Sequence, residues 1–192
     1  MLPLTYWPDE RLVQKCEPVK QIDDAFLLFV ESLKKTMLKE QGLGIAATQV
    51  GVPLQVCLVQ ETYGEEPLVM INPVIEASSK KKVLFGEGCL SFPGLFIEVA
   101  RPAWVDVAYL DLNMKRHLRR FDGLPLSVCV QHEIDHLRGL TFLDRVSRQE
   151  RRKILRKWKQ PWTEYPPPRS TQAKSGSRKA SYKKKKAGRR KK

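Results

Sequence analysis

The charge along this chain changes abruptly near residue 145, and that change limits which part of the chain can fold. Residues 1–144 carry 15 Lys and Arg against 19 Asp and Glu, whereas residues 145–192 carry 20 against 2. A segment with so much unbalanced charge and so few apolar residues cannot bury enough surface to offset the entropy of folding. We therefore divide the chain into a globular domain at 1–146, a basic helix at 147–160 and a basic, disordered tail at 161–192.

The globular part is large enough for one core, since a domain of roughly 150 residues buries most of its apolar surface. No apolar run approaches the ~20 residues of a membrane-spanning helix. The first ten residues lack the basic flank and apolar stretch of a secretion signal, and they include Asp9 and Glu10, which also argues against a transit peptide. We expect a cytoplasmic protein that contacts no membrane. Its four cysteines are then expected to be free thiols: Cys16, Cys57, Cys89 and Cys129.

The sequence predicts three helices. Apolar residues at helical spacing indicate the first, which Asp23 or Asp24 can cap, and Gly139 marks the end of the second. The first spans residues 23–40, the second spans 124–138, and the third spans 147–159 behind a capping box made by Ser147 and Glu150. Short β-like runs separate the first two helices; they lie at 54–60, 68–74, 81–85, 95–99 and 103–111. This order is typical of an α+β fold. We expect small mixed or antiparallel sheets packed around the helix at 124–138.

The central helix carries the motif His132-Glu133-Ile134-Asp135-His136. Residues four apart lie on one face of a helix, so both imidazoles can bind the same metal ion. Glu133 follows the first histidine directly and can direct a carboxylate at a water on that ion. The chain has only one other histidine, His117, so a surface helix that carries two histidines by coincidence is a poor explanation.

A catalytic site of this kind needs a third protein ligand and an open position for water. In one large class of proteases the third ligand is an acidic residue further along the chain, and Asp144 and Glu150 are the candidates here. Glu150 is better explained as part of a helix cap. The other candidate is Cys89, because a thiolate ligand is reasonable in a reducing compartment. An ordinary buried cysteine is the alternative reading, so the spacing alone leaves the third ligand open.

A third segment, GLGIAATQ at 42–49, is rich in small residues. Such residues let a backbone approach a ligand closely, although a turn that ends the first helix would also account for the glycines. Gln49 at its end could donate an amide N–H to an oxygen that becomes negatively charged during a reaction.

Three segments together resemble the signature motifs of the peptide deformylases: GLGIAATQ at 42–49, EGCLS at 87–91 and QHEIDH at 131–136. The resemblance covers roughly residues 1–150. It implies an enzyme that removes the formyl group from the N-terminal formyl-methionine of new polypeptides and releases formate. It also implies one divalent ion, usually ferrous iron in the cell, with zinc, nickel or cobalt as possible substitutes.

Carried over motif by motif, the resemblance assigns Cys89, His132 and His136 as metal ligands. Glu133 would be the general base and acid toward a metal-bound water that attacks the formyl carbon. Gln49 and the backbone N–H of Leu90 would hold the formyl oxygen. The remaining matches lie beside the substrate or around its methionine side chain: Gly44 and Glu87 in the first group, and Leu43, Phe85, Leu90, Val128 and Cys129 in the second. Ser91 and Asp135 are interpreted as structural.

One position departs from the familiar bacterial pattern. An arginine near Phe96 helps to hold the substrate backbone in those members, whereas this chain is apolar there and reads FPGLFIEVARP after EGCLS. Arg101 matches a basic position slightly further on. Recognition of the peptide beyond methionine is therefore left open.

Two other functions remain as alternatives. One is a metalloprotease with the same helix motif, which would need a third ligand other than Cys89. The other is an RNA- or ribosome-binding protein whose deformylase-like body is inactive. As partners we expect formyl-methionyl nascent peptides, and also the ribosome or its RNA, bound by the basic residues after 146. We expect a monomer.

Overall fold

The structure is a computed structural model that describes residues 1–159 and confirms an α+β fold. Its helices in that part of the chain are α1 (Asp24–Lys39), α2 (Leu126–Leu137) and α3 (Arg148–Lys157), with short 3-10 turns η1 (Glu10–Val13), η2 (Ala47–Val50) and η3 (Phe142–Asp144). The tail expected to be disordered, 161–192, lies outside the described residues. Within residues 1–159, no helix is both long and apolar enough to cross a membrane.

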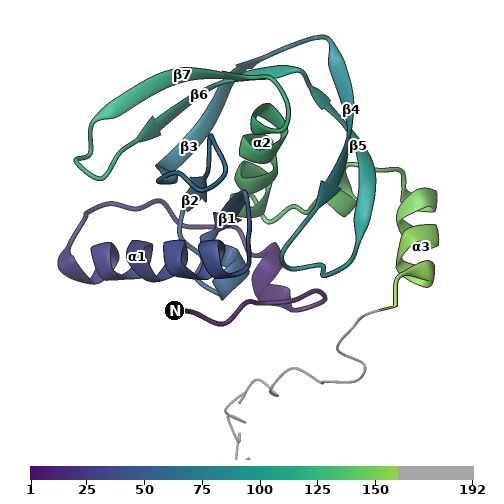
Figure 1. Cartoon of the computed structure of the whole chain (residues 1–192), viewed down its shortest axis with the longest axis horizontal. Helices are drawn as coiled ribbons and strands as arrows, with labels where there is room; N and C mark the ends of the chain where they lie inside the picture. Colours follow the sequence, from purple (N-terminus) through teal and green to yellow (C-terminus); the bar gives the residue numbers. More distant parts are fainter. Residues whose placement is uncertain (160–192) are drawn as a thin grey trace, which may run out of the picture. The chain divides into compact units, whose positions relative to one another are not determined.

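The strands form two antiparallel sheets. Five of them pair in the order β1-β2-β3-β6-β7: β1 (Gly44–Ala46), β2 (Val56–Val59), β3 (Leu68–Ser78), β6 (Trp104–Leu110) and β7 (Arg116–Asp122). The other two, β4 (Lys82–Gly88) and β5 (Phe96–Pro102), pair only with each other. The strands curve around α2, which contacts β1, β2, β6 and β7 of the larger sheet and β5 of the smaller one (Figure 1).

The helix α2 is central because its apolar residues recur at helical spacing. Val130, Ile134 and Leu137 pack into the core formed with the larger sheet, which includes Cys57 and Met70. Ten of the twelve residues of α2 are buried. This burial fixes the orientation of the helix and therefore the direction in which its polar residues point.

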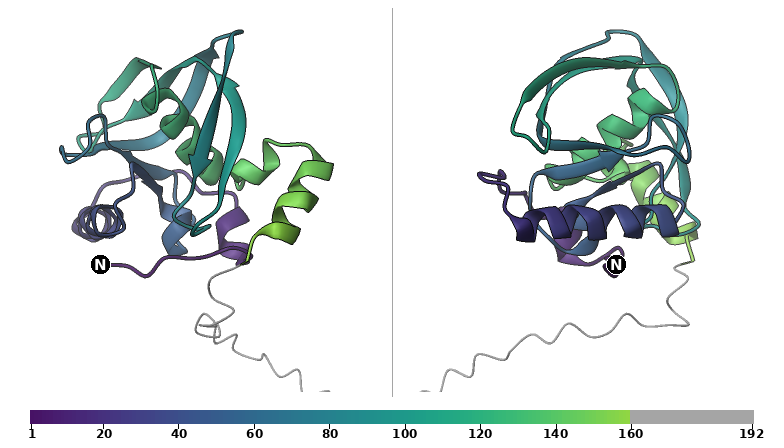
Figure 2. Two further views of the ribbon diagram at one scale, coloured as in Figure 1. Left: turned by 45° about the vertical axis from the view of Figure 1, so that its right-hand side comes forward. Right: turned by 60° about the vertical axis from the view of Figure 1, so that its left-hand side comes forward.

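The helix α1 covers the larger sheet near β1 and β2. Asp23 caps it by accepting a hydrogen bond from the N–H of Phe26 at 2.8 Å, as the sequence predicts. Its buried face includes Leu33 and Met37, which pack in one cluster with Ile45 of β1. The helix α3 lies at the opposite side of the molecule, beyond β5 (Figure 2).

The strand β7 was missed in the sequence analysis because its sequence, RHLRRFD, is mostly charged. Only Phe121 is buried there. The strand is held instead by pairing along its whole length with β6. Three of its arginines also form ion pairs: Arg116 with Glu76 of β3, Arg119 with Glu61 just after β2, and Arg120 with Asp106 of β6. A hydrophobic pattern cannot reveal a strand of this kind.

The helix α3 begins where the capping box predicts, since Ser147 accepts a hydrogen bond from the N–H of Glu150 at 3.2 Å. It ends at Lys157, two residues earlier than expected, because Trp158 is extended. None of its residues is fully buried, although Ile154 and Leu155 pack partly against the core cluster around Phe92.

Candidate active site

Cys89, His132 and His136 come together in the structure. Cys89 directly follows β4, whereas both histidines lie on the face of α2 that is turned toward it. One ligand atom from each residue lies within 4.8 Å of the other two, and Cys89 Sγ is 3.3 Å from His136 Nε2. One thiol and two imidazoles are a suitable donor set for zinc, iron or a similar divalent ion. The residues present therefore fit the metal that the sequence implies.

The ring of His132 is oriented by Glu87. Its Nδ1 lies 2.8 Å from Glu87 Oε2, so the imidazole donates to the carboxylate and its other nitrogen is left for a metal. Such a carboxylate–imidazole pair fixes the tautomer of a ligand histidine. Glu87 lines the cavity, as expected of a residue beside the substrate, but both of its oxygens are also bound by Arg101.

Arg101 joins β4, β5 and α2 through a buried ion network. It binds Glu87 and also donates from Nη1 to Asp135 Oδ2 at 2.7 Å, and Arg145 binds the same aspartate. Burial alone would raise the pKa of Glu87, but hydrogen bonds from Arg101 and His132 outweigh it and lower that pKa. Glu87 and Asp135 are thereby kept ionised behind the two histidines.

Glu133 lies on the wall of the site and is 3% exposed. Burial raises the pKa of its carboxyl to about 7. Its Oε2 is buried and has no hydrogen-bond partner among residues 1–159. A Cβ atom on Gly44 would lie 2.6 Å from Glu133 Oε1 and 2.9 Å from Cys129 Sγ. Only glycine at position 44 therefore lets β1 approach this part of α2.

The side-chain amide of Gln49 is held in one orientation. Its Oε1 accepts a hydrogen bond from the N–H of Ala46 at 2.8 Å. Its Nε2 consequently points toward Cys89 Sγ, at 3.4 Å, and toward Ser91 Oγ, at 3.3 Å. An amide N–H group is thus fixed beside the proposed ligands.

A cavity of about 570 Å³ opens onto this site. Its walls include these residues selected from the sequence: Leu43, Gly44, Gln49, Phe85, Glu87, Cys89, Leu90, Val128, Cys129, His132 and Glu133. His136 is 1% exposed and is not part of the wall. The exposed ring of Phe96 lies at the cavity, in contact with Gly88.

Among the cavity residues that gave no sequence signal are Leu4 and Tyr6. They come from the N-terminal segment, which a hydrogen bond from the N–H of Thr5 to the carbonyl of Gln49, at 2.7 Å, fixes beside the site. Their location depends on tertiary structure alone.

The acidic alternatives for a third ligand do not join the group of Cys89, His132 and His136. Asp144 accepts hydrogen bonds from the N–H and hydroxyl of Thr141 and from Arg151. Glu150 is exposed in the first turn of α3. The geometry required by the metalloprotease alternative is therefore absent from residues 1–159.

Comparison with known proteins agrees with the resemblance of the sequence motifs. The family model described as polypeptide deformylase matches residues 1–152. The peptide deformylase of Brucella suis biovar 1 is 39% identical over 160 residues, which cover 82% of this chain and 91% of the relative. That of Rhizobium meliloti is 40% identical over 159 residues, which cover 81% and 91%.

Solved structures agree. A peptide deformylase from Legionella pneumophila superposes with a TM-score of 0.77 at 35% identity, covering 82% of this chain and 93% of its own. One from Synechococcus elongatus, solved in complex with actinonin, gives 0.75 at 39% identity, covering 81% and 86%.

Proposed function

Because the chain belongs to the peptide deformylase family, and is therefore a hydrolase that removes a formyl group, we propose how its own residues carry out that reaction. Cys89, His132 and His136 hold the metal on which this family depends. Glu133 moves the protons, and Gln49 with the Leu90 backbone N–H binds the formyl oxygen. The observation that carries the proposal is the buried carboxylate oxygen of Glu133, which has no hydrogen-bond partner in the described part of the chain and belongs to the residue next to the ligand His132.

The substrate is the formyl-methionyl end of a nascent peptide. The methionine side chain occupies the apolar part of the cavity, whose walls include Leu43, Phe85, Leu90, Val128 and Cys129. The strand β1 is at the edge of the larger sheet and β4 belongs to a sheet of two strands, and both line the cavity. Edge strands offer unpaired backbone groups to an extended peptide, so the substrate backbone binds between them.

The metal is one divalent ion, and we propose ferrous iron in the cell. Zinc binds such ligands more tightly than ferrous iron does, and nickel or cobalt also fits the donor set. The ion supplies Lewis acidity, which polarises a carbonyl and makes water acidic near neutral pH. Ferrous iron reduces oxygen, whereas divalent nickel does not, and the products of that reaction would oxidise the thiolate of Cys89. We therefore expect iron-loaded enzyme to lose activity in air faster than nickel-loaded enzyme.

The protons move through Glu133. Its carboxylate accepts a proton from the water that attacks the formyl carbon, and it later gives that proton to the amine that leaves. Gly44 lets the backbone of β1 pass close to this carboxylate. Gln49 Nε2 and the Leu90 N–H donate to the formyl oxygen as negative charge develops there. The products are formate and a free methionyl N-terminus.

The direct test is formate release from a short formyl-methionyl peptide by protein purified without oxygen. The acetyl-methionyl peptide is the control, because it differs only in the acyl group. We expect rapid release of formate and little hydrolysis of the control. Cleavage of an internal peptide bond, with no formate released, would favour the metalloprotease alternative and contradict the proposal.

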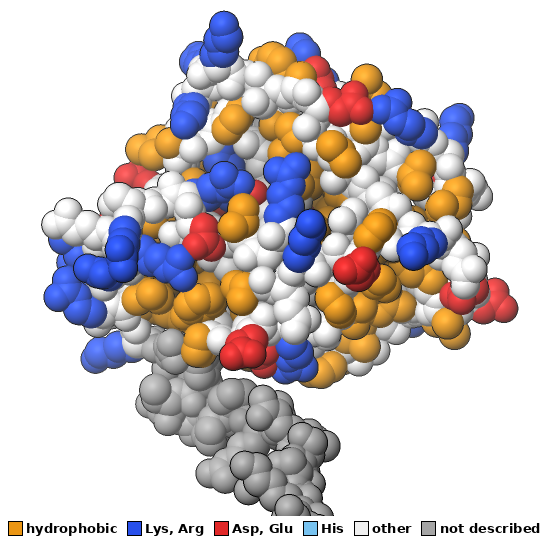
Figure 3. All heavy atoms as spheres, turned by 180° about the vertical axis from the view of Figure 1, so that it is seen from behind, with side chains coloured by type: hydrophobic (Ala, Val, Ile, Leu, Met, Phe, Trp, Pro, Cys, Tyr) orange, Lys and Arg blue, Asp and Glu red, His pale blue; other side chains and the backbone are white. Residues whose placement is uncertain are grey.

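We further propose that the enzyme is a cytoplasmic monomer that works beside the ribosome. By sequence we divide it into a catalytic domain at 1–146, a basic segment at 147–160 that includes α3, and a basic segment at 161–192. Seen from behind, Lys and Arg side chains gather over α3 (Figure 3); they are Arg148, Arg151, Arg152, Lys153, Arg156 and Lys157. Cations in this density favour RNA phosphates. Binding there would raise the local concentration of new formylated chains.

A further inference from the structure

The loop that follows Cys89 is held by aromatic packing. Phe92 is fully buried and contacts the rings of Trp7 and Trp158. The centroid of each tryptophan ring is 5.5 Å from the centroid of the Phe92 ring. Phe142 meets it edge-on at 4.9 Å. Phe92 is only three residues beyond the proposed ligand Cys89, so its packing limits where the cysteine can move.

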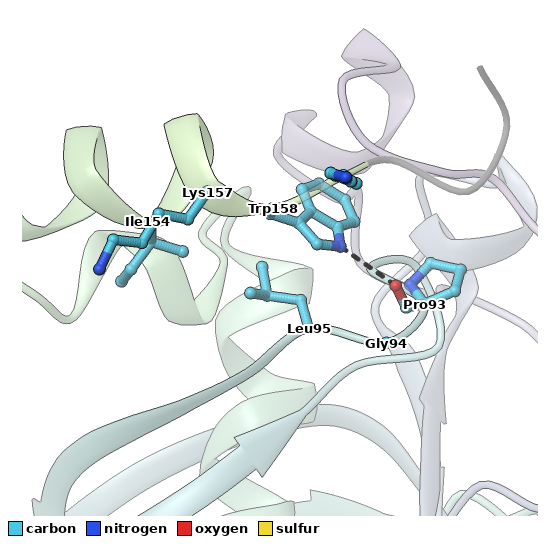
Figure 4. Close-up of a pocket in the computed structure, with 7 residues that line it drawn as sticks. Pro93, Gly94, Leu95, Ile154, Lys157 and Trp158 are labelled. Atoms are coloured by element: carbon cyan, nitrogen blue, oxygen red, sulfur yellow. Dashed lines mark hydrogen bonds between the residues drawn. The ribbon is translucent and has the colours of Figure 1, made fainter.

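The same loop separates two cavities. Pro93 and Gly94 line the active-site cavity, and they also line a groove of about 720 Å³ against the end of α3. In that groove the indole of Trp158 points at the loop, and its Nε1 donates to the carbonyl of Pro93 at 3.2 Å (Figure 4). Trp158 therefore contacts the loop on the side that faces away from the substrate.

Trp158 contacts this loop through the ring of Phe92 and through the backbone carbonyl of Pro93. The loop has few bonds of its own: the N–H of Phe92 donates to the carbonyl of Cys89 at 2.9 Å, and that of Leu95 donates to Phe92 at 3.0 Å. Two short turns of this kind define a conformation weakly by themselves. The N–H of Trp7 also donates to the carbonyl of Ser91 at 3.1 Å. The indole of Trp158 adds a tilted ring contact with Phe92 and a hydrogen bond at the centre of the turn.

The aromatic cluster also reaches a second proposed ligand. Phe142 contacts the ring of His132 edge-on, with centroids 5.7 Å apart and planes 75° to one another. A continuous series of ring contacts thus leads from Trp158 through Phe92 and Phe142 to His132. Packed interiors transmit small displacements because they contain few voids.

We propose that Trp158, the residue that ends α3, is a positioning residue for the metal site: through Phe92 and Pro93 it fixes the loop that carries Cys89 and Leu90. The inference rests on the proposed role of Cys89, His132 and His136. The end of the basic helix then helps to hold the metal site in place, although no residue of α3 lines the active-site cavity.

The first test is hydrogen exchange of the full-length protein without metal, measured for a peptide covering residues 90–95. In Trp158→Ala we expect exchange about tenfold faster than in wild type, because two contacts are lost. Trp158→Phe keeps an aromatic ring and loses the indole N–H. For this variant we expect exchange about fivefold faster than in wild type, the ratio that one hydrogen bond typically gives. Trp104→Ala is the matched control, since Trp104 is half-buried on β6 and packs against Arg120 instead.

Equal exchange of this peptide in Trp158→Ala and Trp104→Ala would overturn the proposal. If Trp158→Ala loses protection throughout the domain, the Trp158→Phe variant becomes the test. Exchange of residues 90–95 at the wild-type rate in Trp158→Phe would then overturn the proposal. The measurement needs no metal, so its result is separate from the ligand assignment. Failure of that assignment would appear as wild-type protein that binds no cobalt.

The second test separates positioning from general stability. In cobalt-loaded Trp158→Ala we expect transfer of the ion to a chelator about tenfold faster than in Trp104→Ala, the size typical of losing support behind a ligand. We also expect kcat to fall about tenfold with KM within about twofold, because reacting groups are displaced while the methionine pocket is intact. Unchanged release and kcat would contradict the proposal.

Discussion

The helices α2 and α3 differ in where their charged residues lie: those of α2 are buried, and those of α3 are not. Ten of the twelve residues of α2 are buried, and six of these are polar: Ser127, Gln131, His132, Glu133, Asp135 and His136. In α3 six of ten residues are basic, and none is buried. One helix is surrounded by partners from both sheets, whereas the other touches the domain only along one edge.

The difference shows how burial assigns function. A buried ionisable group is stable only when it is paired or when its charge is suppressed. Asp135 and His132 meet this condition through their partners Arg101 and Glu87. Glu133 is the one carboxylate among residues 1–159 that keeps a buried oxygen without a hydrogen-bond partner. Chemistry is therefore expected at Glu133. The cations of α3 other than Arg151, which pairs with Asp144, are exposed to water and available to a polyanion.

Glu133→Gln is expected to have the largest effect on the α2 side of the comparison. The amide is similar in size but cannot accept a proton, so kcat for formate release should fall by ~10²–10⁴ while the ion stays bound. Glu98→Gln is the matched control, because Glu98 is exposed on β5. A Glu133→Gln enzyme with turnover close to wild type would exclude the assigned role.

Arg101→Met should strongly reduce the free energy of unfolding. It leaves the carboxylates of Glu87 and Asp135 buried without their shared cation, and breaking a buried pair typically costs ~3–5 kcal/mol. Urea titration gives the loss. The matched control is Arg120→Met, which breaks an exposed ion pair with Asp106 and should have a much smaller effect. Similar losses in both variants would show that burial does not distinguish the two sites.

Charge reversal on α3 should weaken binding to ribosomes without affecting catalysis on a free peptide. Changing Arg152 and Arg156 to Glu should lower ribosome affinity by about tenfold or more at moderate salt. With each cation lost, binding neutralises fewer RNA phosphates and therefore releases fewer counterions. Lys80→Glu with Lys82→Glu makes the same charge change on an exposed segment away from α3. Co-sedimentation in which both double variants bind equally would remove α3 from the account.

Truncation separates α3 from the tail in the same assay. A chain stopped after Gln160 lacks the tail, and a chain stopped after Ser147 lacks the helix as well. We expect partial loss of sedimentation from the first and full loss from the second. Equal sedimentation of both and of the whole chain would mean that neither segment is the tether.

Ser147→Ala should have the smallest effect. Loss of the cap leaves the Glu150 N–H without its partner, which typically costs ~1 kcal/mol of helix stability. Hydrogen exchange within Arg148–Lys157 should become about fivefold faster, with α2 unchanged. Equal acceleration in α2 would mean that the two helices are not independent.

Periodic residues explain what the sequence could predict. Apolar spacing located α1 to within a few residues, and signals at the helix ends did the same for α2 and α3. The pair His132 and His136 indicated a metal because their separation is a property of any helix. The sequence could not reveal β7, whose stability comes from partners distant in the chain. It also could not place Arg101 behind the histidines or Tyr6 beside the cavity, because both positions depend on how separate elements pack.

The most direct test of the account combines metal analysis with formate release, in anaerobically purified wild type, Cys89→Ser and Cys16→Ser. Cys16 is buried in the core outside the site and serves as the matched control. The account predicts about one divalent ion per chain, as in other three-ligand sites, and rapid formate release from wild type and Cys16→Ser, with both lost in Cys89→Ser. A Cys89→Ser protein that keeps its ion and its activity would contradict it.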